Sequence, residues 1–170
     1  NGDLKMLSAK LAKKINEQMN LELFSALLYQ QMAAWASAKS FEGASSFLYA
    51  HAKEELEHKQ RLFNYLCDTG AMPVITALEA PQHDFKSLED VFKKTLDHEL
   101  FISKSINELV GAALEEKDFS SFTFLQWFVS EQHEEEKLFR TILEKLQLIG
   151  KDGHGLLVFD KELAQIHAAK

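Results

Sequence analysis

Cysteine is almost missing from this sequence of 170 residues, in which Cys67 is the single example. One thiol cannot form an internal disulfide framework or a cysteine-rich zinc or iron–sulfur site. Proline and glycine are also scarce, at two and seven residues, and no stretch approaches the roughly 20 apolar residues of a membrane span. These shortages favour a protein of the reducing cytoplasm and predict no membrane partner.

Positive charge is in short supply, because 19 lysine and arginine residues face 26 aspartate and glutamate residues, for a net charge of −7. We therefore expect cations rather than nucleic acid as partners. The beginning of the chain has neither the basic segment nor the apolar core of a secretory signal. Residues 1–5 precede Met6 and are interpreted as a leader or a cloning remnant, so the predicted single domain spans residues 6–170.

Helix-favouring residues dominate what remains. Long runs rich in Leu, Ala, Glu, Lys and Gln, without the alternation typical of strands, predict an all-α fold. Ser87 and Asp90 form the pattern of a capping box at the start of the third helix. Gly70 is the predicted end of the second helix and Asp160 the predicted N-cap of the last. The predicted helices cover about residues 8–37, 44–69, 88–115, 120–149 and 160–170.

Residues 71–86 contain both prolines and show no helical period. Helices of about 28 residues are about 42 Å long, whereas 16 extended residues can span up to about 53 Å. The segment is therefore long enough to travel the full length of a helical bundle. This predicts a four-helix bundle with a long crossover between its second and third helices, rather than an up-down-up-down bundle.

Polar side chains interrupt the apolar stripes of all four long helices. On the second helix, Glu55 shares a heptad-spaced stripe with Leu48 and Leu62, and His58 lies on the adjoining stripe. A Glu-x-x-His pair alone more often belongs to a solvated face. The other helices, however, carry matching groups among apolar positions, and these are Glu22, Glu99, Gln132 and Glu135.

The two halves of the chain repeat this layout at one constant separation of 77 residues, which relates Glu22, Glu55 and His58 to Glu99, Gln132 and Glu135. Two helical hairpins thus present similar groups at similar depth, as two halves of one site would. Their four glutamates carry four negative charges when ionised, and buried carboxylates cost several kcal/mol each unless neutralised. Two divalent cations would cancel that charge. Carboxylates with one imidazole favour iron or manganese, although zinc could also bind.

Four other side chains lie near these stripes. Tyr29, one heptad after Glu22, could donate a hydrogen bond to a site carboxylate, act as an electron donor, or simply fill the core. Trp127 is interpreted as a packing residue. His51 and His133 have no counterpart in the other half of the chain, so we expect them at the surface or between subunits.

Five segments give the chain a resemblance to bacterial non-haem ferritin. They are NEQMNLEL at 16–23, LLYQQM at 27–32, HAKEELEH at 51–58, LCDTG at 66–70 and FLQWFVSEQHEEEKLF at 124–139. The similarity covers essentially all of residues 6–161. It implies a ferritin-like four-helix bundle with a long crossover and a short fifth C-terminal helix, assembled into a hollow shell of 24 subunits that stores a ferric oxyhydroxide mineral.

The resemblance also implies a ferroxidase centre that binds two irons. The first iron would be held by Glu22, Glu55 and His58, and the second by Glu55, Glu99 and Glu135. Glu55 would bridge the two irons, Gln132 would lie close by, and Tyr29 would contact the ligands. A third iron position, toward the interior of the shell, would be formed by Glu54, Glu131 and Glu134.

Departures from related families narrow the prediction. A bacterioferritin would carry a second Glu-x-x-His and a haem-ligating methionine just after the bridging glutamate, but these positions hold Leu138 and Leu56. The resemblance therefore implies no haem. A rubrerythrin would need rubredoxin cysteines, which a single thiol cannot supply.

The predicted function is iron storage with ferroxidase activity in the cytoplasm, in which O₂ or H₂O₂ oxidises Fe²⁺ and no nucleic acid takes part. Two alternatives stay open. The first is a soluble di-iron carboxylate oxidase that acts on another substrate and stores no mineral. The second is a structural or interaction protein whose inward acids are merely paired, although the stripes carry no lysine or arginine to pair them.

Overall fold

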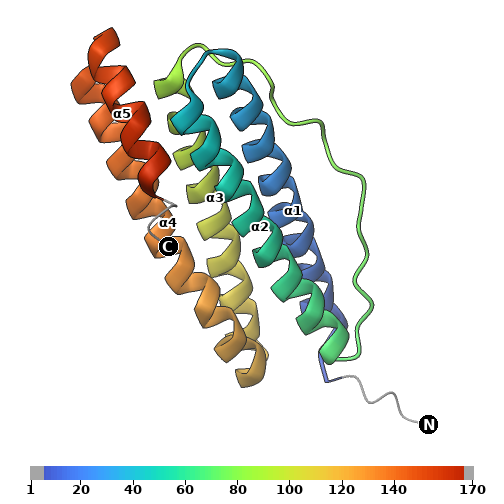
Figure 1. The fold of residues 1–170 in the computed structure, drawn as a ribbon. Coiled ribbons are helices and arrows are strands. Elements are labelled where there is room, and N and C mark those ends of the chain that lie inside the picture. Colours follow the sequence, from blue (N-terminus) through green and yellow to red (C-terminus); the bar gives the residue numbers. More distant parts are fainter. Residues whose placement is uncertain (1–5, 167–170) are drawn as a thin grey trace.

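A computed structural model describes residues 6–166 of the chain as five helices and no strand (Figure 1). Four long helices lie side by side, and a short fifth helix packs at one end of the bundle. The helices are α1 Ala9–Ala38, α2 Glu42–Asp68, α3 Leu88–Glu115, α4 Phe119–Ile149 and α5 Gly153–Ile166. The predicted fold class is confirmed.

Polar side chains fix the beginnings of the long helices. Ser8 Oγ accepts a hydrogen bond from the Leu11 backbone N–H at the start of α1. Ser87 Oγ does the same for Asp90 N–H at the start of α3, and Asp90 in turn accepts from Lys86 N–H, each at 3.0 Å. The predicted cap of α3 is therefore present, and it satisfies backbone donors that have no partner within the helix.

The crossover between α2 and α3 runs along the outside of the bundle, from one end to the other (Figure 1). Two asparagines of α1 hold it there. Asn16 exchanges hydrogen bonds with both the N–H and the carbonyl of Val74, and Asn20 donates to the same carbonyl while accepting from Thr76 N–H, at 2.7 to 3.0 Å. These side chains supply hydrogen-bond partners to backbone groups of the extended segment, which has no neighbouring strand to supply them.

The core consists of two apolar clusters separated by a polar layer. One cluster, toward α5, includes Phe47, Phe92 and Phe139. The other, toward the opposite end, includes Ile15 and Phe128. The interrupting polar residues lie between these clusters, so apolar packing on both sides holds the polar layer away from water. No helix within residues 6–166 is long and apolar enough to cross a membrane.

The fifth helix corrects the prediction made for Asp160. The helix begins at Gly153, seven residues earlier than predicted, and Asp152 accepts from Gly155 N–H at its first turn. Asp160 instead lies buried in the middle of α5 and caps α2, accepting from the N–H groups of Gly43 and Ala44 at 2.9 and 2.7 Å. The predicted part of this helix after Ile166 lies outside the described residues.

Glycine at position 43 is required by this contact. An added Cβ would lie 1.7 Å from the Asp160 carbonyl oxygen, well inside any allowed separation. α2 has no side-chain cap of its own. The close approach of two backbones therefore lets one carboxylate of α5 satisfy the first donors of α2 and favourably meet its positive helix end.

Candidate metal centre

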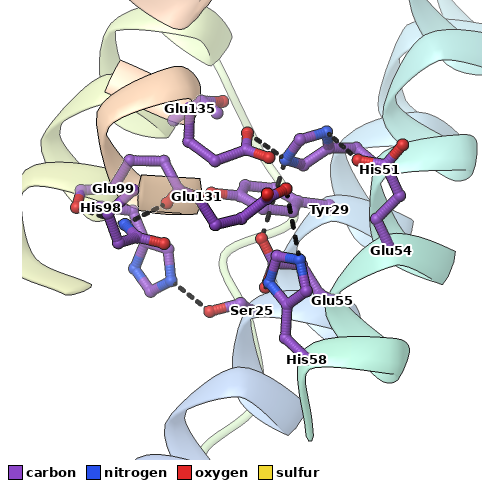
Figure 2. A network of polar contacts seen from close by, with 12 residues as sticks. Ser25, Tyr29, His51, Glu54, Glu55, His58, His98, Glu99, Glu131 and Glu135 are labelled. Carbon is purple, nitrogen blue, oxygen red and sulfur yellow. Dashed lines mark hydrogen bonds and ion pairs between the residues drawn. The ribbon is translucent and has the colours of Figure 1, made fainter. Parts of the chain in front are cut away.

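All six interrupting side chains are buried in the polar layer, with exposed fractions of 0 to 4%. Each long helix contributes at least one of them, because their heptad positions turn them to the same side as the neighbouring apolar residues. Figure 2 shows the carboxylates of Glu55, Glu99 and Glu135 converging with His58 and Tyr29 in the middle of the bundle. The structure thus brings the predicted groups together.

Glu22, Glu55 and His58 form the first half of the site. One ligand atom from each lies within 4.8 Å of the others. His58 Nδ1 is 3.0 Å from Glu55 Oε2, and Gln18 Nε2 donates to Glu22 Oε1 at 3.0 Å. The other carboxylate oxygen of Glu22, Oε2, is buried and has no hydrogen-bond partner among residues 6–166. An oxygen so placed fits a cation, since a buried acceptor without a partner is costly.

Glu99 and Glu135 form the second half, together with two hydrogen-bond donors. Tyr29 OH donates a short hydrogen bond to Glu99 Oε1. Gln132 Nε2 donates to Glu99 Oε2 at 3.0 Å, to the Glu99 carbonyl at 3.3 Å and to Ser103 Oγ at 3.2 Å. Both oxygens of Glu99 are therefore engaged, and Tyr29 makes the carboxylate contact that the sequence allowed.

His51 was predicted at the surface or between subunits, and this prediction is wrong. Its side chain is fully buried, and Nε2 lies 2.9 Å from Glu135 Oε2 and 3.7 Å from Glu55 Oε1. The rings of Tyr29, Phe47 and Phe139 surround it at 4.8 to 6.0 Å between centroids. Two signals could have placed it, namely its spacing of seven residues from His58 and of four from Glu55. His133 is exposed, as predicted.

The three acids expected at a third metal position are differently placed. Glu54 is half-buried and groups with His51 and Glu135, within 4.8 Å, and its Oε2 is 3.6 Å from His51 Nδ1. Glu131 Oε1 lies 3.7 Å from His58 Nε2, on the side of the first half (Figure 2). Glu134 is exposed. The geometry therefore puts an imidazole beside Glu54, where the sequence pointed to carboxylates alone.

Trp127 packs against the site from outside. Its ring lies edge-on to His58, at 5.2 Å, and to Phe128, at 4.9 Å. The Arg61 guanidinium covers its ring at 3.9 Å from the centroid, which is a favourable cation–π distance. These contacts agree with the packing role predicted for Trp127.

Burial and neighbouring charges raise the pKa values of two of the carboxyl groups, those of Glu55 and Glu99. Desolvation raises the pKa of Glu55 well above its usual value, and the charge of Glu99 adds to this effect. Desolvation, followed by the charge of Glu135, raises the pKa of Glu99 to about 7. Burial alone would lower the pKa of His58, but the carboxylates of Glu131 and Glu55 outweigh it and raise this pKa to about 11. In the metal-free site, protons on Glu55, Glu99 and His58 therefore offset part of the negative charge that bound cations would otherwise neutralise.

The donor set fits divalent or trivalent cations that prefer oxygen and imidazole. Five of the buried side chains can ligate such a cation as carboxylate or imidazole, namely Glu22, Glu55, His58, Glu99 and Glu135. Within residues 6–166 their ion pairs are with one another, with the buried His51 or with Glu131, and none involves lysine or arginine. Three cavities of about 470 to 480 Å³ elsewhere in the structure have none of the five in their linings. Among residues 6–166 the ion pairs of the buried carboxylates are therefore with histidine and not with lysine or arginine, and the carboxylates do not line any of these three cavities.

Fold and site together define a four-helix bundle with a candidate carboxylate–histidine metal site at mid-length. The sequence model of the ferritin-like domain matches residues 12–149. The chain belongs to the ferritin family, and its relatives include bacterial non-heme ferritins. The chain is 55% identical to the bacterial non-heme ferritin of Escherichia coli O6:H1 over 161 residues, which are 95% of this chain and 98% of the relative. The chain is 49% identical to the bacterial non-heme ferritin of Campylobacter jejuni, and the match covers 95% of this chain and 96% of the relative.

Solved structures agree with this assignment. An open-pore ferritin from the archaeon Archaeoglobus fulgidus superimposes with a TM-score of 0.93 at 38% identity, covering 94% of this chain and 98% of that one. An engineered closed form of the same ferritin gives a TM-score of 0.91 at 39% identity, covering 93% and 96%. Membership of this family implies that the chain binds iron.

Proposed function

We propose that the chain is an iron-storage protein with ferroxidase activity, which oxidises Fe²⁺ to Fe³⁺ at a two-iron site inside each subunit. The observation that carries this proposal is the buried cluster of four carboxylates and one histidine, which has no lysine or arginine counter-charge among residues 6–166 and leaves Glu22 Oε2 without a hydrogen-bond partner there. Fe²⁺ is the substrate, and O₂ or H₂O₂ accepts the electrons.

The proposed ligands divide between the two halves of the site. Glu22, Glu55 and His58 would hold the first iron. Glu55, Glu99 and Glu135 would hold the second, with Glu55 as the bridge and Gln132 beside it. Each oxygen of Glu99 already accepts one hydrogen bond, from Tyr29 or from Gln132, and keeps a second lone pair that could bind iron. A third iron position is proposed at Glu54, with Glu131 and Glu134 as further candidate ligands.

Charge balance explains why iron suits the site. Four ionised carboxylates carry four negative charges, which two Fe²⁺ ions cancel, and two Fe³⁺ ions joined by one oxide also bring four positive charges. The site can therefore remain neutral in both oxidation states, which limits the electrostatic cost of oxidation in a low-dielectric interior. The protons that Glu55, Glu99 and His58 hold in the metal-free protein are released when the cations bind.

Storage, assembly and location complete the proposal. We propose a shell of 24 subunits in the cytoplasm, with a ferric oxyhydroxide mineral inside it and no haem. The archaeal relative is an open-pore ferritin, and an engineered closed form of it has also been solved. Leu56, at the position of the haem-binding methionine of bacterioferritins, is a half-exposed apolar residue that lacks a ligand atom.

A stepwise aerobic Fe²⁺ titration of the metal-free protein tests the proposal. We expect a fast rise in ferric absorbance up to two or three irons per subunit, followed by slower uptake of many more irons that stay soluble with the protein. Glu55→Ala should lose the fast phase, whereas Glu57→Ala, at an exposed acid two residues away, should keep it. Fast oxidation that stops at the stoichiometry of the site would instead support an oxidase acting on another substrate.

A further inference from the structure

A buried amide outside the predicted ligands contacts Glu22. Gln18 lies one helical turn before Glu22 on α1 and is only 2% exposed. Its Nε2 donates to Glu22 Oε1 at 3.0 Å, and its Oε1 accepts from Ser105 Oγ, on α3, at 2.5 Å. A chain of two hydrogen bonds therefore ties Glu22 across the helix interface to Ser105.

The amide of Gln18 has only one favourable orientation. A carboxylate can accept hydrogen bonds but cannot donate them, so the neighbour of Glu22 Oε1 must be the NH₂ group. Rotating the amide by 180° would put two oxygens 3.0 Å apart in the interior, where such repulsion is weakly screened. Ser105 then donates to the remaining oxygen. Because both ends of the amide have fixed partners, Gln18 is held rigidly.

Holding Oε1 leaves one oxygen of Glu22 for a cation. Oε2 is buried, has no hydrogen-bond partner among the described residues, and belongs to the group formed with Glu55 and His58. The second half of the site differs, since Tyr29 and Gln132 occupy both oxygens of Glu99. Glu22 is thus the carboxylate whose geometry is already set for metal binding through a single oxygen.

We propose that Gln18, oriented by Ser105, is a positioning residue that makes Glu22 a monodentate ligand of the first metal. This inference rests on the proposed function only in assigning a metal to Glu22, Glu55 and His58. A residue that orients a ligand by hydrogen bonding raises metal affinity without touching the metal, and its loss commonly lowers that affinity 10- to 100-fold.

The test uses Co²⁺ alone, titrated into the metal-free full chain without oxygen and followed by visible absorption. Gln18→Leu should raise the dissociation constant of the first Co²⁺ about tenfold. The visible absorption per bound Co²⁺ should also fall in this variant. Without Gln18, the second oxygen of Glu22 is free to bind the ion as well, which increases the coordination number of Co²⁺. Ser105→Ala should weaken binding in the same direction, and Ser105→Thr, which keeps the hydroxyl, should restore it.

Gln126→Leu is the matched control, because the amide of Gln126 lies on α4 and donates to the backbone carbonyl of Phe122. An unchanged dissociation constant and spectrum in a folded Gln18→Leu would overturn the proposal, as would equal weakening in Gln126→Leu. If Gln18→Leu does not fold, the Ser105→Ala and Ser105→Thr pair decides, and equal affinities in that pair overturn it.

Failure of the proposed function would look different. A wild-type protein that binds Co²⁺ tightly, with the expected effects of the variants, but neither oxidises nor accumulates iron would refute iron storage and leave the role of Gln18 intact.

Discussion

Binding of two divalent cations should release protons from the site in an amount that depends on pH. At pH 7, His58, with a pKa of about 11, holds one proton, and Glu99, with a pKa of about 7, holds about half of one. Both must deprotonate to bind a metal. We therefore expect a release of at least about 1.5 protons per pair of cations, to which Glu55 adds because its pKa is also raised.

The sign of the pH dependence follows from Glu99. Its carboxyl pKa is raised in the metal-free protein, so it is more protonated at pH 6 and less protonated at pH 8. The combined release from Glu99 and His58 should fall from about 1.9 protons at pH 6 to about 1.1 at pH 8. Cation affinity should rise over the same range, because fewer protons compete with the metal.

Isothermal titration calorimetry with Zn²⁺, which undergoes no redox change, measures this release when buffers of different ionisation enthalpy are compared. Glu57→Gln alters an exposed acid next to the site and should leave the release unchanged. Glu99→Gln should remove the dependence on pH between 6 and 8 that Glu99 contributes. A release below about one proton at pH 7, or one that does not fall between pH 6 and 8, would refute this account of the metal-free site.

Three further variants test residues that are not themselves proposed ligands. His51→Leu removes the contact to Glu135 and should lower Zn²⁺ affinity about tenfold while the helices still form; unchanged affinity in calorimetry would show that His51 only fills space. Asp160→Ala should destabilise the protein by about 2 kcal/mol, because two charge-assisted hydrogen bonds at a helix start are lost; a denaturation midpoint equal to that of wild type would contradict this. Asn20→Ala should speed hydrogen exchange near Val74, and equal exchange rates would show that the crossover is held by other contacts.

The helices and the polar layer could be predicted from the sequence because both depend on local periodicity. A glutamate such as Glu22 or Glu99 on an otherwise apolar stripe has one plausible direction, and a constant separation of 77 residues relates the two hairpins. The long crossover was predictable from length alone. The directions of these side chains are therefore encoded within each helix.

What the sequence could not show depends on contacts between helices that are distant along the chain. His51 is buried because Tyr29 and Phe139, from α1 and α4, close over it. Asp160 resembles a local N-cap, yet the first turn of α2 is its partner, more than a hundred residues away. Position along one helix does not determine which neighbouring helix supplies the partner.

The outer crossover also has a consequence for how the molecule could be divided. It is the single covalent connection between the α1–α2 and α3–α4 hairpins, and its residues 77–84 lie outside the core that the hairpins share (Figure 1). A chain cut between residues 77 and 84 would give two fragments, each with two of the four buried glutamates and one side of both apolar clusters. Neither fragment can bury its acids alone, so the two fragments should fold only when they associate. A bound cation would stabilise the complex that they form.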